Sequence, residues 1–570
     1  MLPALRDLLD RLPETRRPRL WLSLLCLALW LPGLAALPPG DRDESRFAQA
    51  SRQMVDSGDY VRIRFGEEER NKKPVGIHWA QAASVHAAEA LGLGHRGEIW
   101  PYRIPSLLGA WVAVLATFHW GRALVGRRAA FLGAAMLAAS MVLVVETHIA
   151  KTDAALLGAV TVAMGLLGRA YLAPEVFSAR QAAGLWAALG IAILLKGPIG
   201  PLIALLAILT LAVADRAGGW LRVLRPLWGI PLMLALAAPW MIAIGIATEG
   251  RFFTEALGGD MLSKVSSGEE AHGGPPGYYL LTFALTGFPA AFLVLRALPA
   301  AWRDRMNPAT RFLLAWIAPS WLMFEAVATK LPHYTLPVFP ALMLLGAAWA
   351  MDPLRRPAPR WLSWLGAALL ALVALALGIA AGLLPWLADR RVDPVALLVL
   401  PFALLLLGVA RREWRAGSPA RAMLAAVMLS VPLYAAILGG VLPRLQAPWI
   451  GPRIAAALAA AAPSGEVQGE FGIVGYHEPS LVFATGTDTA LLRDGEAAAA
   501  FLAAGDGRSV AVGDRDLGAF RAAVAARDLP LREAAIVEGY NYTRGRRLRL
   551  HLFQRVSTAS LPTPASGATP

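Results

Sequence analysis

The sequence predicts an α-helical polytopic membrane protein with about thirteen transmembrane helices, followed by a small α/β domain. Of the 570 residues, 56% are hydrophobic and only 16% are charged, whereas a soluble chain carries roughly a quarter charged residues. Apolar runs of about twenty residues, the length that crosses ~30 Å of hydrocarbon as a helix, recur from Leu20 to Leu442. After about Pro443 the chain is polar and has no run long enough to span, which indicates the last domain.

The apolar runs also predict the orientation of the chain. The first run follows five arginines, is long for a signal sequence and ends in Leu37-Pro-Pro-Gly40, a poor cleavage site, so we interpret it as a retained span rather than a signal peptide. Every loop predicted to be cytoplasmic carries arginine, which places the N-terminus in the cytoplasm and the C-terminal domain outside. The expected spans are 20–38, 104–122, 129–147, 154–171, 182–196, 199–214, 227–247, 279–297, 312–329, 335–351, 362–387, 394–410 and 422–442.

The pattern divides the chain into three parts. Residues 1–442 are the predicted membrane domain, with long outer loops at 39–103 and 248–278. Residues 443–556 are the predicted external α/β domain, and residues 557–570, rich in Ser, Thr, Pro and Ala, are predicted to be disordered. Further local elements are amphipathic helix in 76–91, strands in 471–475, 509–512 and 548–553, and a helix over 517–527.

Composition excludes several classes of function. The net charge of +14 does not indicate a nucleic-acid partner, because most arginines lie in short loops that orient the chain in the membrane. The single cysteine, Cys26, allows neither an internal disulfide nor a thiolate metal site. The histidines lack a compact zinc spacing, and no nucleotide-binding motif is present. We expect no metal site and no required cofactor, with a divalent cation held across several loops as the alternative.

Lysine is the most informative residue type. Only six of the 54 Lys and Arg residues are Lys, and all six lie in predicted outer loops or at outer ends of spans. The positive-inside rule predicts the opposite bias, whereas a compact ammonium group suits phosphate as a point charge. The alternative is that these lysines are survivors of drift from Lys to Arg. The six are Lys72, Lys73, Lys151, Lys196, Lys264 and Lys330.

Carboxylates accompany the lysines on the same side. Asp43 and Glu44 follow the first span, and Asp153 begins the fourth span, two residues after Lys151. A charge in hydrocarbon costs on the order of 2.5–3.5 kcal/mol, so these groups need water or a partner. The alternatives are a helix cap for Asp153 and solvated loop charges for the other two. Together with Arg46, these groups predict a site that binds a phosphorylated lipid head group and positions an acceptor.

The order of these motifs resembles that of a known family, the glycosyltransferases that transfer 4-amino-4-deoxy-L-arabinose to lipid A and are related to protein O-mannosyltransferases (glycosyltransferase family 39-like). The resemblance covers nearly the whole chain. It implies a GT-C fold, an undecaprenyl- or decaprenyl-phosphate sugar as donor, and no nucleotide sugar. The motifs are Asp43-Glu-Ser-Arg46, Ser57-Gly-Asp-Tyr60, Lys72-Lys-Pro74, Lys151-Thr-Asp153, Leu195-Lys-Gly-Pro198, Lys330-Leu-Pro-His-Tyr334, Gly475-Tyr-His-Glu-Pro-Ser480 and Glu538-Gly-Tyr-Asn-Tyr542.

The resemblance also implies roles for single residues. Asp43 matches the acidic residue of the first outer loop, for catalysis or acceptor orientation, and Lys73 matches the lysine for the lipid phosphate. Asp153 matches the aspartate of the second loop, and Tyr334 the tyrosine of the Lys-Leu-Pro segment. Where the family commonly has Phe-Glu-Lys-Pro, this chain has Asn71-Lys-Lys-Pro74. The loss of that acidic residue weakens the assignment to aminoarabinose.

We therefore predict a glycosyltransferase of the bacterial inner membrane. It would move a hexosyl or pentosyl group from a polyprenyl-phosphate donor to an envelope acceptor, such as lipid A, another glycan or a protein, on the periplasmic face. The alternative is a lipid or sugar transporter, which predicts mid-span polar residues and internal repeats that the sequence does not clearly show. The candidate catalytic residues are Asp43, Asp153 and Glu44, and those for the donor phosphate and lipid are Lys73, Arg46, Lys151, Lys330, Tyr334 and Lys196.

Overall fold

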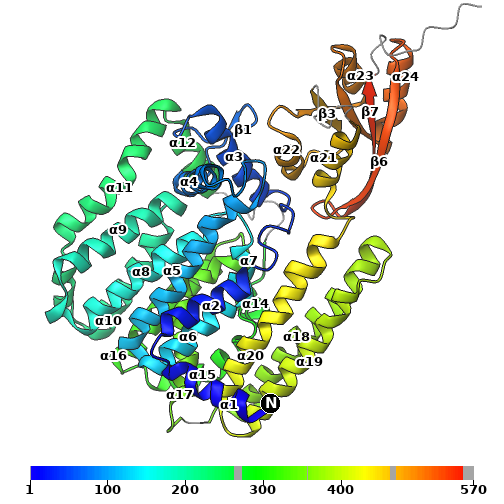
Figure 1. Ribbon diagram of the computed structural model, residues 1–570. Helices are drawn as coiled ribbons and strands as arrows, with labels where there is room; N and C mark the ends of the chain where they lie inside the picture. Colours follow the sequence, from blue (N-terminus) through cyan, green and yellow to red (C-terminus); the bar gives the residue numbers. More distant parts are fainter. Residues whose placement is uncertain (1, 262–272, 356, 462–469, 556–570) are drawn as a thin grey trace, which may run out of the picture.

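The computed structural model describes residues 2–261, 273–355, 357–461 and 470–555. A large helical membrane domain carries a smaller domain with a five-stranded sheet at one end (Figure 1). The predicted disordered tail, 557–570, lies outside the described residues, as do 262–272 of the second long outer loop and, within that segment, Lys264.

Within the described residues, seven helices are long and apolar enough to cross a membrane, or eight if the pair α6 and α7, bent by 58°, counts as one span. The chain is therefore a multi-pass membrane protein, and the number of thirteen spans stays a prediction. The helices of this domain are α1 (Leu2–Arg11), α2 (Pro18–Trp30), α5 (Trp100–Val125), α6 (Arg127–Ala139), α7 (Met141–Thr147), α8 (Asp153–Leu172), α9 (Ala179–Lys196), α10 (Ile199–Asp215), α11 (Pro226–Ala247), α14 (Tyr278–Thr286), α15 (Ala291–Arg303), α16 (Pro308–Ala326), η6 (Pro332–Val338), α17 (Phe339–Met351), α18 (Arg360–Asp389), α19 (Pro394–Arg415), and α20 (Pro419–Tyr434), which continues as η7 (Ala435–Val441).

Two predicted spans differ from the structure for local reasons. The expected helix over 20–38 is only thirteen residues long, because Pro32 and a left-handed Gly33 follow α2. The left-handed backbone of Gly33 brings it against the Leu438 carbonyl of η7, where a Cβ would clash. The expected helix over 279–297 is divided into α14 and α15, because Gly287 and Pro289 interrupt it.

The first long outer loop forms a small layer at the end of the bundle where the sheet domain also lies (Figure 1). It contains α3 (Asp43–Ser57), the hairpin β1 (Arg64–Phe65) and β2 (Glu68–Glu69), and α4 (Gly76–Ala90), which confirms the helix predicted in 76–91. Buried polar contacts join α3 to α4, since the Ser51 hydroxyl lies 2.8 Å from Nδ1 of His78 and donates to the Gln81 side chain at 2.6 Å. The layer is thus packed together rather than loosely hydrated.

The C-terminal domain confirms the predicted strands and helix. Its sheet has the order β4-β3-β5-β7-β6, with β4, β3 and β5 parallel and β7 antiparallel to both of its neighbours. The central strands β3 and β5 are buried throughout, as parallel strands usually are. The elements are α21 (Ile450–Ala461), β3 (Phe471–Val474), α22 (Pro479–Thr485), β4 (Ala490–Leu491), α23 (Gly495–Ala503), β5 (Ser509–Gly513), α24 (Asp514–Ala525), β6 (Leu531–Asn541) and β7 (Arg546–Arg555).

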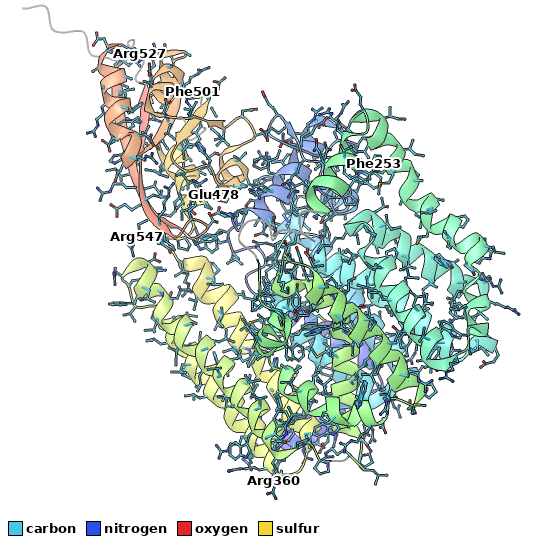
Figure 2. All side chains as sticks on the ribbon, turned by 180° about the vertical axis from the view of Figure 1, so that it is seen from behind. Phe253, Arg360, Glu478, Phe501, Arg527 and Arg547 are labelled. Atoms are coloured by element: carbon cyan, nitrogen blue, oxygen red, sulfur yellow. The ribbon has the colours of Figure 1, made fainter. Side chains whose placement is uncertain are left out.

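The two ends of the molecule differ in what they carry. Figure 2 shows Glu478 of the C-terminal domain and Phe253 of α12 (Arg251–Phe253) toward one end, and Arg360, at the start of α18, at the opposite end. The first outer loop and the sheet domain therefore share one end of the bundle, and the cavity described next lies there.

Candidate active site

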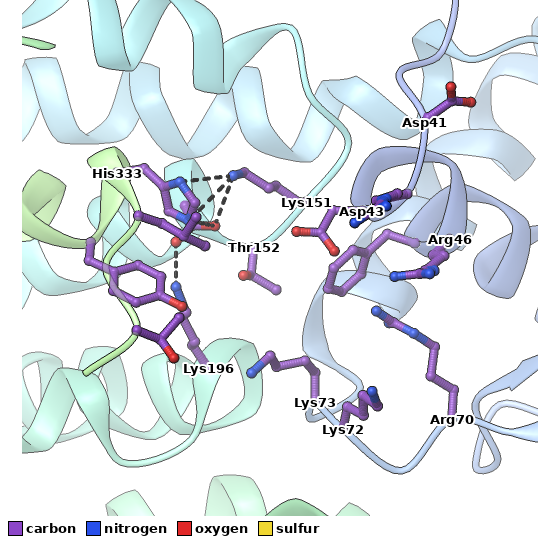
Figure 3. Close-up of a pocket in the computed structure, with 16 residues that line it drawn as sticks. Asp41, Asp43, Arg46, Arg70, Lys72, Lys73, Lys151, Thr152, Lys196 and His333 are labelled. Atoms are coloured by element: carbon purple, nitrogen blue, oxygen red, sulfur yellow. Dashed lines mark hydrogen bonds and ion pairs between the residues drawn. The ribbon is translucent and has the colours of Figure 1, made fainter. Parts of the chain in front are cut away.

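A cavity of about 290 Å³ lies where the first outer loop meets the start of α8, the end of α9 and the segment leading into η6 (Figure 3). Among the described residues, seven Lys and Arg side chains line it, against three Asp side chains. Such a lining favours an anion, because fixed cations in a partly enclosed site reinforce one another's field. The cations are Arg42, Arg46, Arg70, Lys72, Lys73, Lys151 and Lys196.

An ion-pair network holds one wall of this cavity. The Asp153 carboxylate lies 2.5 Å from Nζ of Lys196 and 3.6 Å from Nζ of Lys151. Nζ of Lys151 also lies 2.9 Å from the buried Glu146 carboxylate, and the His333 ring lies 3.7 Å from both carboxylates. Burial alone would lower the pKa of Lys151, but the Glu146 and Asp153 carboxylates outweigh it and raise that pKa. Lys151 therefore stays protonated.

This network answers the alternative interpretation of Asp153 as a helix cap. Asp153 is the first residue of α8, and the residue before it, Thr152, makes no capping hydrogen bond with its side chain. The Asp153 carboxylate is instead only 8% exposed and engaged by two ammonium groups. Its main effect is to fix the positions of Lys151 and Lys196.

A second cavity of about 300 Å³ adjoins the first and shares three of its four lysines. Its remaining walls are largely apolar, so the shared side chains lie at a boundary between a cationic space and an apolar one. The Lys196 ammonium also lies over the Tyr334 ring, 5.0 Å from its centroid. The side chains shared by both cavities are Lys72, Lys73, Asp153, Lys196 and Tyr334. The apolar walls include Met241, Phe252, Phe253, Phe324 and Leu336.

Asp43 lies on the side of the cavity formed by α3. Figure 3 shows it near Arg46, with Lys196 and His333 on the other side. Asp43 opens α3 and is exposed, whereas the residue before it, Arg42, has a left-handed backbone with φ of 64°. Both residues at this sharp entry into the helix line the cavity.

Two predicted site residues lie outside this cavity. Glu44 points away from it and accepts hydrogen bonds from Nε and Nη2 of the fully buried Arg103, at 2.8 and 3.1 Å, and from two backbone amides. Lys330 is also buried, and its ammonium donates to the Val327 carbonyl at 3.1 Å. Neither side chain is among those that line the cationic cavity or its apolar neighbour.

The C-terminal domain contacts the cavity through Asp41. The Asp41 carboxylate accepts hydrogen bonds from the hydroxyls of Ser480 and Tyr476, and the Asp41 backbone amide donates to the Tyr542 hydroxyl at 2.6 Å. Burial raises the pKa of Asp41 to about 6; the Ser480 hydrogen bond opposes this rise and the Glu478 carboxylate adds to it. The motifs at 475–480 and 538–542 thus hold the segment that leads into α3.

This raised pKa gives the stability of the protein a specific pH dependence. Between the ordinary pKa of 3.8 and about 6, folded Asp41 keeps its proton while the unfolded carboxyl loses it, so stability falls as the pH rises through that window. We expect the Tm of the wild type, relative to Asp41→Asn, to fall between about pH 4 and 6 and to stay level above about pH 7. Thermal unfolding in detergent at a series of pH values measures this difference, and a constant difference would contradict it.

Sequence reasoning assigned no role to several of the residues that line the cavity. Arg42 and Arg70 were not singled out, although Arg70 directly precedes Asn71-Lys-Lys-Pro74 and extends its basic run. Phe47 was missed too, and its ring lies 4.7 Å from the Arg70 guanidinium. Its position one turn after Asp43 on α3 was an available signal.

The cavity has few side chains of the kinds that ligate a metal ion. Among the described residues, no three His, Cys, Asp or Glu side chains are grouped as ligands for a metal ion. The carboxylates of the cavity are few and, in the case of Asp153, already engaged by ammonium groups. The donor set therefore suits a bound anion better than a divalent cation.

The bundle, the layer formed by residues 43–90 and the C-terminal sheet domain together define a membrane protein with a GT-C fold. The chain superposes on ArnT from Cupriavidus metallidurans bound to undecaprenyl phosphate with a TM-score of 0.74, covering 95% of this chain and 99% of that one at 21% identity. The same protein in its apo state gives a TM-score of 0.73. At this level of identity, the likeness establishes a shared fold.

Similarity in sequence points to the same group of proteins. Residues 72–242 match the family described as dolichyl-phosphate-mannose-protein mannosyltransferase. The undecaprenyl phosphate-alpha-4-amino-4-deoxy-L-arabinose arabinosyl transferase of Pectobacterium carotovorum is 29% identical over 355 residues, and the protein of the same name from Yersinia pestis is 29% identical over 339 residues. The match to the Pectobacterium protein covers 59% of this chain and 61% of that relative. The chain thus spans about three fifths of the length of the curated relatives that it matches.

Proposed function

We propose that this protein is an inner-membrane glycosyltransferase that transfers a sugar from a polyprenyl-phosphate carrier to an acceptor of the bacterial cell envelope, on the periplasmic face. One observation carries the proposal: a cationic cavity and an apolar cavity meet at Lys72, Lys73 and Lys196. A polyprenyl-phosphate sugar has the same sequence of parts, with an apolar chain, a phosphate and a polar sugar. The names of the relatives and the fold shared with ArnT support this donor class.

The reaction is a displacement at the anomeric carbon. An acceptor oxygen forms the new bond to that carbon, the bond from carbon to the phosphate oxygen breaks, and its electron pair stays on the phosphate. Negative charge therefore grows on the phosphate in the transition state, where Lys73 and Lys196 stabilise it more than in the ground state. Attack from the face opposite to the leaving phosphate inverts the configuration.

Asp43 acts on the acceptor side. For a hydroxyl acceptor, Asp43 takes the proton as the oxygen attacks, since its carboxylate opens into the cavity. An acceptor phosphate is already ionised, and Asp43 then orients it instead. Asp153 positions Lys151 and Lys196 and does not act as the base. Arg46 and Tyr334 form part of the walls around the donor head group.

The cavity also bears on which sugar is carried. The relatives are named for 4-amino-4-deoxy-L-arabinose, whose amine is cationic at neutral pH. This chain has Lys72 where the family commonly has an acidic residue, so an ammonium group on the sugar would be placed among further cations. We therefore propose a sugar without an amino group as the preferred donor.

The test is a transfer assay with purified protein in detergent, labelled undecaprenyl-phosphate sugars with and without an amine, and cell-envelope lipids, glycans and proteins as acceptors. We expect transfer by the wild type, and a donor KM that is about 10–100-fold higher in Lys73→Met, because one charge-assisted contact to phosphate is lost. Arg64→Met is the matched control, since Arg64 lies in the same outer loop but outside both cavities.

Two results would contradict the proposal. An unchanged donor KM and full transfer in Lys73→Met would show that the donor phosphate does not bind beside Lys73. Binding of the donor without transfer to any acceptor, together with passage of the lipid across proteoliposomes, would favour the transporter alternative.

A further inference from the structure

A third cavity, of about 560 Å³, lies between α15, α18 and α19, far from the candidate active site. It is at the end of the bundle where Figure 2 shows Arg360. Four arginines line it, and no carboxylate among the described residues does. The four are Arg296, Arg360, Arg411 and Arg415.

Arg296 is the buried cation among the residues that line this cavity. It lies within α15, seven residues before the helix ends, and is only 3% exposed. Its guanidinium lies 4.1 Å from the centroid of the Trp414 ring and 5.2 Å from that of Phe292, and it donates to the Ser363 carbonyl. Within the described part of the chain, the Arg296 Nε has no hydrogen-bond partner, and no carboxylate lines the cavity to balance the guanidinium charge. A buried cation of this kind is costly unless an anion neutralises it.

The remaining walls of the cavity suit a hydrocarbon chain. Ala367 and Ala371 on α18 leave space beside Leu370 and Leu407, which supply apolar contacts. Trp364 also lines the cavity and is 78% exposed, so the cavity opens at the surface of α18, a helix long and apolar enough to cross a membrane. The site therefore combines cations at one end with an apolar groove along α18, which is the pattern of an amphiphile with an anionic head.

We propose that this cavity binds an anionic phospholipid of the surrounding bilayer. Its phosphodiester lies among Arg296, Arg411 and Arg415, and one acyl chain follows the groove along α18. Basic pockets between transmembrane helices bind anionic lipid head groups in this way, because the phosphate supplies the counter-ion that the protein lacks. The bound lipid links α15 to the α18–α19 hairpin. This proposal is independent of sugar transfer.

The test measures the Tm of the purified full-length protein in detergent during titration with phosphatidylglycerol or with phosphatidylcholine of the same acyl chains. We expect phosphatidylglycerol to raise the Tm in a saturable way, because it binds the folded state, and phosphatidylcholine to have no such effect. In the double variant Arg411→Gln/Arg415→Gln, the half-maximal concentration of phosphatidylglycerol should rise at least about tenfold.

Arg411 and Arg415 are exposed, so their replacement leaves the core intact. The matched control is Arg303→Gln/Arg305→Gln. Arg303 is the last residue of α15 and Arg305 follows it; both are exposed and lie outside the cavity. An unchanged titration in the first double variant, an equal loss in the control, or an equal effect of phosphatidylcholine would overturn the proposal. So would a rise in Tm given by inorganic phosphate or undecaprenyl phosphate but not by phosphatidylglycerol.

Discussion

Asp43→Asn is expected to reduce sugar transfer by about 10²–10⁴-fold, the range for loss of a general base, without lowering the Tm. The substitution keeps the size of the side chain and removes its negative charge and its basicity. Asp43 is exposed in the cavity at the first turn of α3. Its charge also helps to raise the pKa of the buried Lys151, but Lys151 keeps Glu146 and Asp153 as ion-pair partners when Asp43 is replaced. Initial rates at saturating donor, together with thermal unfolding, measure both parts of this expectation.

The size of the loss also identifies the acceptor. A hydroxyl acceptor needs its proton removed and should show the full reduction, whereas an ionised phosphate acceptor needs orientation and should show the lower end of the range. Full activity in Asp43→Asn, with the fold intact, would contradict the assignment of Asp43 as the base and the orienting group.

Glu44→Gln is expected to have the opposite profile and to destabilise the protein by about 3–5 kcal/mol, as loss of one partner of a buried ion pair does. Glu44 is 5% exposed and Arg103 is fully buried. Without the carboxylate, Arg103 keeps hydrogen bonds to the carbonyls of Leu34 and Leu37 but loses its counter-ion. The free energy of unfolding in denaturant measures the effect.

Glu44→Gln is also the matched control for Asp43→Asn, because the two carboxylates are adjacent in sequence. We expect the transfer rate per folded molecule of Glu44→Gln to stay close to that of the wild type. A normal Tm combined with a loss of transfer equal to that of Asp43→Asn would show that Glu44, too, takes part in the chemistry. The two variants therefore distinguish a carboxylate that stabilises the fold of the first outer loop from one that takes part in catalysis.

The predictions from sequence succeeded where the signal is local. Apolar runs of sufficient length marked the membrane helices, and alternating or continuous apolar stretches marked β3, β5 and β7. They were less accurate where a single residue interrupts a run. Gly287 and Pro289 divide one predicted span into α14 and α15, a break that hydropathy averaged over a window does not detect.

The candidate site shows the same division. The scarcity of Lys drew attention to six residues, and four of them line one cavity. The local pattern gave Asp43 and Glu44 the same status, because they are neighbouring carboxylates in one loop, and only the family resemblance singled out Asp43. Arg103 lies in α5, about sixty residues after Glu44 in the chain. It reaches the Glu44 carboxylate only because α5 packs against the first outer loop.

The sequence by itself therefore determined the multi-pass membrane architecture and the small set of lysines, because both follow from composition and its order along the chain. Only the tertiary structure decided which charges act together. It joined Lys151, Asp153, Lys196 and His333 from three separate segments and removed Glu44 and Lys330 from the cavity. It also brought Asp41 into contact with Ser480 of the sheet domain. Ion pairs and burial depend on distances between segments remote in sequence, which no local pattern specifies.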